Sequence, residues 1–181
     1  MRIAIAVVLL SAGGAFGGER FGERGTVSPS GSVSLGFWGS GSNGSGLAPG
    51  AMVFVADGLA VGGSALLFYS SGSGLSYATF GIAPSVGLNL WVRDRLSFFP
   101  QVSLQATLRQ FTSGGDVTQR ELATTVYLPF LLHVTPHFFI GLGPSASIPV
   151  ASRTTGSSIS GLTFGTGGNF VLLNSVIGGW F

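Results

Sequence analysis

The sequence contains no cysteine and no lysine, and charged residues make up only 8% of its 181 residues. The lack of cysteine excludes a structural disulfide and a lipid anchor on an N-terminal cysteine. The lack of lysine excludes a phosphate-binding P-loop. Of all residues, 45% are hydrophobic, and the mean hydropathy of the chain is +0.56. Such a chain is unusually apolar for a protein whose whole surface faces water.

Long apolar runs are also missing after the N-terminal segment. Gly, Ser and Thr interrupt every apolar stretch before it reaches the roughly 18 residues that a transmembrane helix needs. The other structure that satisfies its backbone hydrogen bonds in lipid is a closed β-barrel, whose strands alternate apolar and polar residues. We therefore look for alternation rather than for apolar runs.

The first residues have the pattern of an export signal. Arg2 supplies a positive charge, an apolar stretch follows from Ile3 to Ala12, and small residues precede Gly18. We expect a cleaved signal peptide at 1–17 and one domain at 18–181. Without Arg2 the chain has seven Arg against six Asp and Glu, a surplus of about one charge. The sequence therefore gives no reason to expect a nucleic-acid partner.

Several segments alternate strictly between two kinds of side chain. Between 97 and 111 one face carries Phe98, Pro100, Val102, Leu104, Ala106 and Leu108, and the other carries Ser97, Phe99, Gln101, Ser103, Gln105, Thr107 and Arg109. Segments 78–90 and 122–133 follow the same rule. A soluble secreted sandwich or barrel, the alternative reading, usually carries many charges on its polar face. The small, weakly polar face here instead favours a barrel with an apolar exterior.

Eight such segments occur, at about 30–39, 49–56, 59–70, 76–91, 95–111, 120–134, 137–150 and 168–181. The gaps between them are alternately long and short, and the longest is 151–168. We therefore predict an all-β fold, an eight-stranded antiparallel up-and-down transmembrane β-barrel with short turns and both termini on the periplasmic side. Five prolines lie inside these segments and require bulges or strand ends, because proline donates no ladder hydrogen bond: Pro84, Pro100, Pro129, Pro144 and Pro149.

Aromatic residues gather at both ends of the predicted strands. We expect two interfacial girdles, with Phe37, Tyr69, Tyr77 and Phe111 at the long-loop end and Phe54, Trp91, Phe98, Phe130, Phe138 and Phe181 at the short-turn end. Inward-facing aromatics are expected as well, and these would plug the barrel. They are Trp38 and Phe68 near the long loops and Trp91, Phe99, Phe139 and Trp180 near the short turns.

Three stretches resemble the small eight-stranded outer-membrane β-barrel proteins of the OmpX/OmpW-like superfamily of Gram-negative bacteria. They are the hairpin from Met52 to Gly63, the segment from His133 to Val150, and the terminal "IGGWF". The resemblance implies a bacterial outer-membrane location, contact with membrane lipid, and biogenesis through periplasmic chaperones and the barrel-assembly machinery. It also implies that Ile177, Trp180 and Phe181 form the C-terminal assembly signal. We further expect a monomer without cofactor.

Neither catalytic residues nor a metal site are predicted. His133 and His137 flank a turn, but no third ligand lies near them in sequence, so we interpret them as interfacial turn histidines. A barrel hydrolase would need a nucleophile beside a histidine and a carboxylate, and both histidines lie at the short-turn end. We therefore expect a non-enzymatic protein.

The candidate lumen and rim residues are Arg109, Glu121, Trp38, Trp91 and Trp180. Arg109 and Glu121 flank the third long loop, where a pair between them is geometrically plausible as a rim salt bridge. The alternative is that Arg109 gates or binds an anion. An eight-stranded interior is nearly filled by side chains, and this one has almost no charge. We therefore predict a structural or surface-interaction role, with a narrow conduit for small or apolar molecules as the alternative.

Overall fold

The computed structural model describes residues 20–38, 42–72, 75–111, 117–156, 159–164 and 170–181. These ranges contain twelve strands: β1 Val27–Trp38, β2 Ser42–Ala56, β3 Leu59–Gly72, β4 Leu75–Leu88, β5 Leu90–Arg93, β6 Leu96–Phe98, β7 Gln101–Phe111, β8 Val117–Tyr127, β9 Phe130–Thr135, β10 Phe138–Gly156, β11 Ile159–Phe164 and β12 Phe170–Gly179. A membrane-spanning helix is not found among the described residues.

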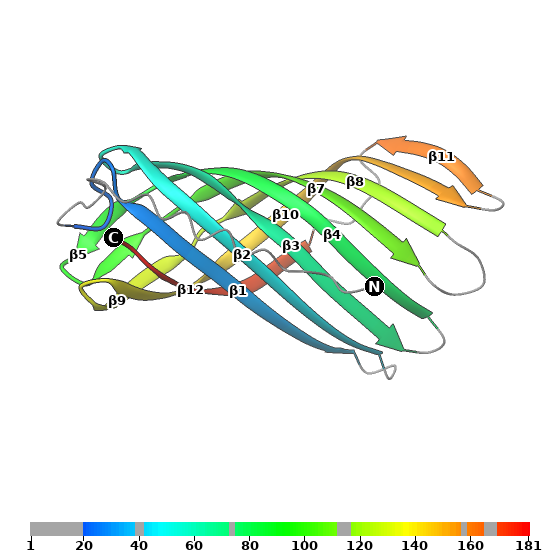
Figure 1. Cartoon of the computed structure of the whole chain (residues 1–181), viewed down its shortest axis with the longest axis horizontal. Coiled ribbons are helices and arrows are strands. Elements are labelled where there is room, and N and C mark those ends of the chain that lie inside the picture. Colours follow the sequence, from blue (N-terminus) through cyan, green and yellow to red (C-terminus); the bar gives the residue numbers. More distant parts are fainter. Residues whose placement is uncertain (1–19, 39–41, 73–74, 112–116, 157–158, 165–169) are drawn as a thin grey trace, which may run out of the picture.

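The strands close into an antiparallel barrel that is longer than it is wide (Figure 1). Eight strands form the ring, in the order β12, β1, β2, β3, β4, β7, β8 and β10, and β10 pairs with β12 to close it. The two ends of the described chain also join, because Val27 and Phe181 exchange backbone hydrogen bonds of 2.9 and 3.1 Å. The predicted all-β, eight-stranded antiparallel barrel is confirmed.

Three predicted strands are each interrupted near the short turns. The breaks fall at Asn89 between β4 and β5, at 99–100 between β6 and β7, and at 128–129 between β8 and β9. Backbone hydrogen bonds still cross the breaks, from Leu88 to the Pro100 carbonyl and from Phe99 to the Pro129 carbonyl, at 3.0 and 2.9 Å. β5, β6 and β9 then extend the barrel wall at this end.

These irregularities accommodate the five prolines. Pro100 and Pro129 lie in the breaks, and Pro144 lies where the pairing of β10 passes from β8 to β9. Pro149 begins a β-bulge against β8, and Pro84 lies in a gap of the ladder between β4 and β7. Each proline therefore avoids a ladder position that requires an N–H donor.

The strands reach further toward the long loops than the sequence predicts. β2 begins at Ser42 instead of 49, and β10 continues to Gly156 and pairs with β11 across residues expected to form a loop. The β10–β11 hairpin projects at the end of the barrel opposite the C-terminus (Figure 1). The predicted loop at 151–168 is thus largely strand, because Ser and Thr are compatible with a ladder once a partner strand is present.

Candidate functional site

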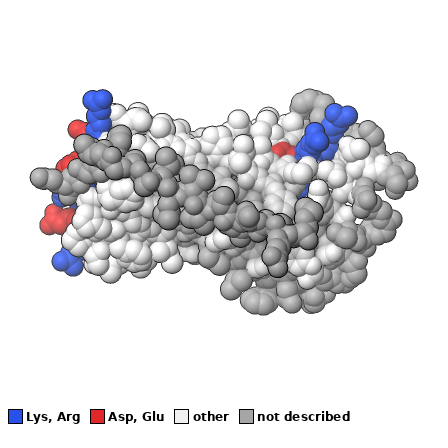
Figure 2. All heavy atoms as spheres, in the orientation of Figure 1, with Lys and Arg blue, Asp and Glu red and all other residues white. Residues whose placement is uncertain are grey.

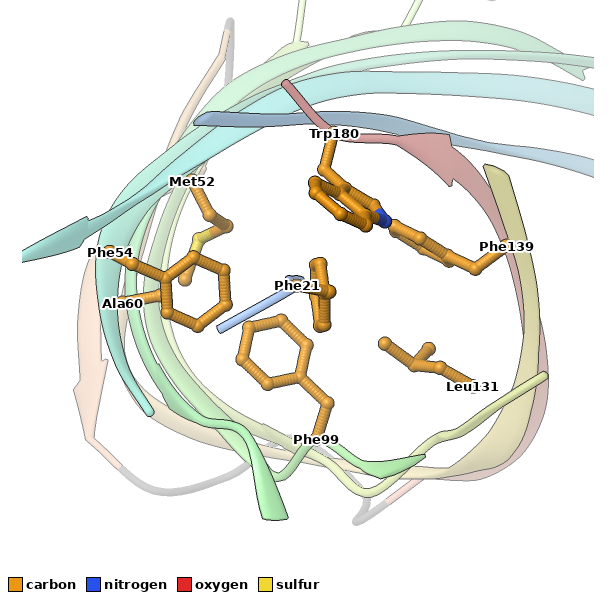
Figure 3. Packing of buried hydrophobic residues seen from close by; sticks show 8 residues of the cluster. All are labelled: Phe21, Met52, Phe54, Ala60, Phe99, Leu131, Phe139 and Trp180. Carbon is orange, nitrogen blue, oxygen red and sulfur yellow. The ribbon is translucent and has the colours of Figure 1, made fainter. Parts of the chain in front are cut away.

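A cluster of buried side chains closes the short-turn end of the barrel from inside (Figure 3). Phe21 lies at its centre, 1% exposed, with its ring centroid 5.0 Å from Phe54, 5.3 Å from Phe139 and 5.7 Å from Phe99. We call this cluster the turn-end plug; its members are Phe21, Met52, Phe54, Ala60, Phe99, Leu131, Phe139 and Trp180.

The segment that carries Phe21 is attached to the barrel wall by hydrogen bonds. The Phe21 carbonyl accepts from Asn89 Nδ2 at 3.3 Å and from Trp91 Nε1 at 3.2 Å. The Gly22 carbonyl accepts from the Gly58 N–H at 2.7 Å. Below them, Arg24 N–H donates to Asp57 Oδ1 at 2.9 Å. Phe21 is therefore held by the β2–β3 turn and by the wall where β4 passes into β5.

Trp91 and Trp180, predicted to face the lumen, both contribute to this end. Trp180 is 6% exposed and belongs to the plug, while Trp91 packs against the plug and lies under the Arg20 guanidinium at 4.8 Å. Phe54 was predicted in the outer girdle, and this is wrong, since its ring is 1% exposed and lies inside. Its distance from the turn suggested a girdle, but the alternation of β2 turns it inward.

The inward position of Phe21 is not predicted by the sequence pattern. Phe21 precedes the first strand and follows no alternation, so its neighbours carry no sign of which way it points. The only signal is a single aromatic residue between charged residues and glycines, at Arg20, Gly22 and Glu23. That signal is too weak to predict a buried ring.

The two histidines do not form a metal site. His133 is buried, its Nε2 lies 3.0 Å from Ser97 Oγ, and its ring lies 4.7 Å from that of Trp91. His137 is exposed, and its Nδ1 lies 3.2 Å from the Trp180 carbonyl. His133 is therefore an interior residue rather than the predicted interfacial turn histidine. In the described ranges, no three His, Cys, Asp or Glu side chains are placed to hold a metal ion.

Ser97 and His133 resemble two members of a hydrolase triad, but their surroundings do not. Ser97 is 0% exposed, so a substrate cannot reach its hydroxyl. In the described part of the chain, no carboxylate hydrogen-bonds to the His133 ring. The pair therefore satisfies two buried polar groups instead of activating a nucleophile.

Polar side chains form a hydrogen-bonded layer in the interior, on the long-loop side of the plug. Thr125 Oγ1 donates to Gln105 Oε1 at 3.3 Å, and it shares a hydrogen bond of 3.1 Å with the Ser147 hydroxyl. Asn174 Nδ2 donates to Ser145 Oγ at 2.6 Å, and Tyr127 Oη donates to the Asn174 carbonyl at 3.2 Å. The groups of this layer are uncharged and bond mostly to one another across neighbouring strands. The layer is thus built like a polar core and lacks the charged rings of an ion pore.

Arg109 faces the interior near the long loops. Its Cζ lies 5.1 Å from the centroid of the Tyr77 ring, which also contacts Phe68 and Phe111. The predicted girdle positions of Tyr77 and Phe111 are therefore wrong, because both rings share the inner face with Arg109. Tyr69, 54% exposed, does point outward as predicted.

The pair of Arg109 with Glu121 that the sequence made plausible is not formed. The register places Gln119 opposite Arg109 and Thr107 opposite Glu121. In the described part of the chain no salt bridge joins the two side chains, and Arg109 Nε is buried without a hydrogen-bond partner. Trp38 ends β1, and its side chain lies outside the described residues.

The outer surface is apolar between two charged ends. Figure 2 shows basic and acidic side chains at both ends of the barrel, and none between them on its visible described face. Between Phe80 and Val92, on β4 and β5, the outward residues are all uncharged: Phe80, Ile82, Pro84, Val86, Leu88, Leu90 and Val92. At ~3.3 Å per residue and a tilt of about 40°, the path from Phe80 to Val92 rises about 30 Å. We call this surface the apolar belt.

No protein-family model matches the sequence, and a search of curated proteins finds no match either. The crystal structure of Neisserial surface protein A (NspA) is similar to this barrel, with a TM-score of 0.61. The alignment covers 86% of this chain and 96% of that one, at 11% sequence identity. At this identity the likeness shows a shared fold.

Proposed function

We propose that this chain is an integral outer-membrane β-barrel that acts as a closed structural or surface-interaction protein, without enzymatic activity. The turn-end plug is the observation that carries this proposal. Its centre is filled by Phe21, Phe54, Phe99 and Phe139, at ring distances typical of packed aromatic pairs. A path for solutes along the barrel axis would have to displace this cluster.

The apolar belt supports the membrane location. Its height of about 30 Å is that of a bilayer hydrocarbon core, and Arg93 follows directly below Val92. Large outward side chains such as Leu104, 47% exposed, and Leu173, 70% exposed, would face water in a soluble protein. Burial of this belt in lipid removes that unfavourable contact.

The narrower assignments belong to the same proposal. We place the chain among OmpX/OmpW-like proteins of Gram-negative bacteria, exported by the segment 1–17, with both ends of the barrel domain in the periplasm. The outward Ile177 and Phe181, 57% and 55% exposed, support recognition of the last strand by the barrel-assembly machinery. Trp180 would instead act in the signal through its place in the turn-end plug. The similarity in fold to Neisserial surface protein A is consistent with this assignment.

The test uses the full chain expressed with its N-terminal segment in a Gram-negative host. Outer membranes are isolated and run on a denaturing gel with and without boiling, and the unboiled species is reconstituted in a planar bilayer. A porin reconstituted in parallel controls for insertion. We expect a band in the membrane fraction whose migration shifts on boiling, and no conductance steps.

Two results would contradict this proposal in different ways. Discrete conductance from the shifted species would leave the membrane barrel intact and favour the conduit instead. Recovery in the soluble fraction only, without a heat-dependent shift, would reject the outer-membrane assignment.

A further inference from the structure

Two arginines lie side by side on the outer face of the barrel, near the long loops. Arg120 on β8 is the direct register partner of Arg153 on β10, and both are exposed. The same cross-strand row continues to Leu108 and Phe80. Like charges directly opposite each other destabilise a sheet. Unless an anion binds between them, this pair therefore lowers the stability of the barrel.

A β-bulge places Arg153 on this face. Before the bulge, even-numbered residues of β10 such as Ile148 point outward. The register shifts between Pro149 and Ala151, with Val150 as the extra residue, so odd-numbered residues point outward afterward. Without the shift, Arg153 would face the interior, away from Arg120. The irregularity of β10 therefore creates the pair.

An apolar hollow of about 680 Å³ lies beside the two arginines and reaches onto the upper part of the apolar belt. Small residues in the next cross-strand row, Ala106 and Ala151, alternate there with Ile82 and Leu122. Phe80 and Leu108 line the hollow beside the arginines. The surface thus combines two guanidinium groups with an adjoining apolar groove.

The arginines have no protein counter-ion in the described ranges. Neither side chain forms a salt bridge or a hydrogen bond with another described residue. Glu121, the neighbour of Arg120 in sequence, alternates to the inner face. The charged residues described at this end are Arg109, Arg120, Glu121 and Arg153, a net charge of +2 from three basic groups and one acidic group.

We propose that Arg120 and Arg153 bind the phosphate of an acylated, phosphorylated lipid of the outer leaflet, one of whose acyl chains lies in the adjoining hollow. Guanidinium groups bind phosphate oxygens through paired, charge-assisted hydrogen bonds, and two of them can share one phosphate. The proposal rests on the outer-membrane location, since that places the pair at the level of the headgroups and the hollow at the level of the acyl chains.

The test measures lipid retention by native mass spectrometry of the purified, heat-shifting barrel. The probes are bisphosphorylated lipid A and the same lipid after enzymatic removal of its phosphates. The variants are Arg120→Gln with Arg153→Gln, and Ala106→Phe, which fills the groove without changing the charge. Arg93→Gln with Arg95→Gln removes the same charge at the other end and serves as the control.

We expect wild type and control to retain the phosphorylated lipid with equal affinity. The affinity of the Arg120/Arg153 variant for the phosphorylated lipid should fall about tenfold or more, because two charge-assisted contacts are lost. Removal of the lipid phosphates should have a similar effect on wild type, and Ala106→Phe should weaken binding as well.

Equal retention by the arginine variant, equal retention of the dephosphorylated lipid, or complete competition by inorganic phosphate would overturn the lipid site. A gel run with each variant shows whether the barrel itself is folded, and so distinguishes failure of the lipid site from failure of the proposed outer-membrane barrel. If the shifted band remains while selective binding is absent, only the lipid site is rejected. If the shifted band is absent from wild type, both proposals are rejected.

Discussion

At the scale of single residues, Phe21 and the glycine that follows it determine how the short-turn end is closed. Phe21 contacts five aromatic rings of the barrel interior: Phe54, Phe99, His133, Phe139 and Trp180. Gly22 has a φ of +99°, a backbone conformation that residues with a Cβ rarely adopt. The segment before β1 is thus specified by one large residue and by one that has no side chain.

Phe21→Ala should destabilise the barrel by about 3–5 kcal/mol, the usual range for removal of a buried aromatic ring. The measurement is the temperature at which the compact band on the gel converts to the unfolded one. Phe21→Leu refills much of the volume and should lower that temperature by less than half as much. An unchanged conversion temperature for Phe21→Ala would show that this ring does not hold the plug together.

Gly22→Ala should cost about 1–3 kcal/mol in the free energy of unfolding, because of its positive φ. A Cβ at this position would also lie 2.6 Å from Asn89 Nδ2, which donates to the Phe21 carbonyl. Denaturant titration in vesicles measures the effect. Gly31→Ala is the matched control, since the nearest atom to its Cβ lies at 3.7 Å, and it should be close to neutral. Equal stability of the two variants would contradict the strained geometry at Gly22.

At the scale of elements, the strand breaks and their opposing glycines shape the barrel wall. β8 breaks at 128–129, and Gly143 on β10 faces that break. A Cβ on Gly143 would meet the Leu128 carbonyl oxygen and, at 2.5 Å, Pro129 Cα. Both are backbone atoms, so a side-chain rotation cannot relieve the contact.

Gly143→Ala should therefore prevent β8, β9 and β10 from pairing in their native register. We expect little or no heat-shifting band in the membrane fraction, with the chain degraded or aggregated. Gly31→Ala, made in parallel, should give the normal band. A normal yield of folded Gly143→Ala would indicate that the wall at this break can move apart at low cost.

Element positions could be predicted from sequence because alternation is a local signal. The outward set of 97–111 was predicted in this way, and Val102 and Leu104 are indeed exposed while Phe99 is buried. Position near a strand end is a weaker signal than alternation, and it gives the wrong face for Phe54, Tyr77 and Phe111. The bulge after Pro149 was also beyond prediction, because a one-residue shift in register depends on the partner strand.

At the scale of the whole molecule, polarity is arranged opposite to that of a soluble barrel. The outside is apolar and the middle of the inside is polar, so the stability of the protein depends on what surrounds it. The neighbouring fold of NspA shows that this strand arrangement closes with a similar overall shape at 11% identity. The fold is therefore shared although most of the aligned residues differ.

The central claim, that the belt lies in lipid, is tested most directly by an arginine at two depths on β7. Leu104 and Gln110 both point outward, Leu104 near the middle of the belt and Gln110 near its long-loop rim. The measurement is the free energy of unfolding in phospholipid vesicles for Leu104→Arg and Gln110→Arg. We predict a loss of about 2–4 kcal/mol for Leu104→Arg and about 0–1 kcal/mol for Gln110→Arg. Equal, small losses at both depths would mean that this face meets water and would contradict the membrane barrel.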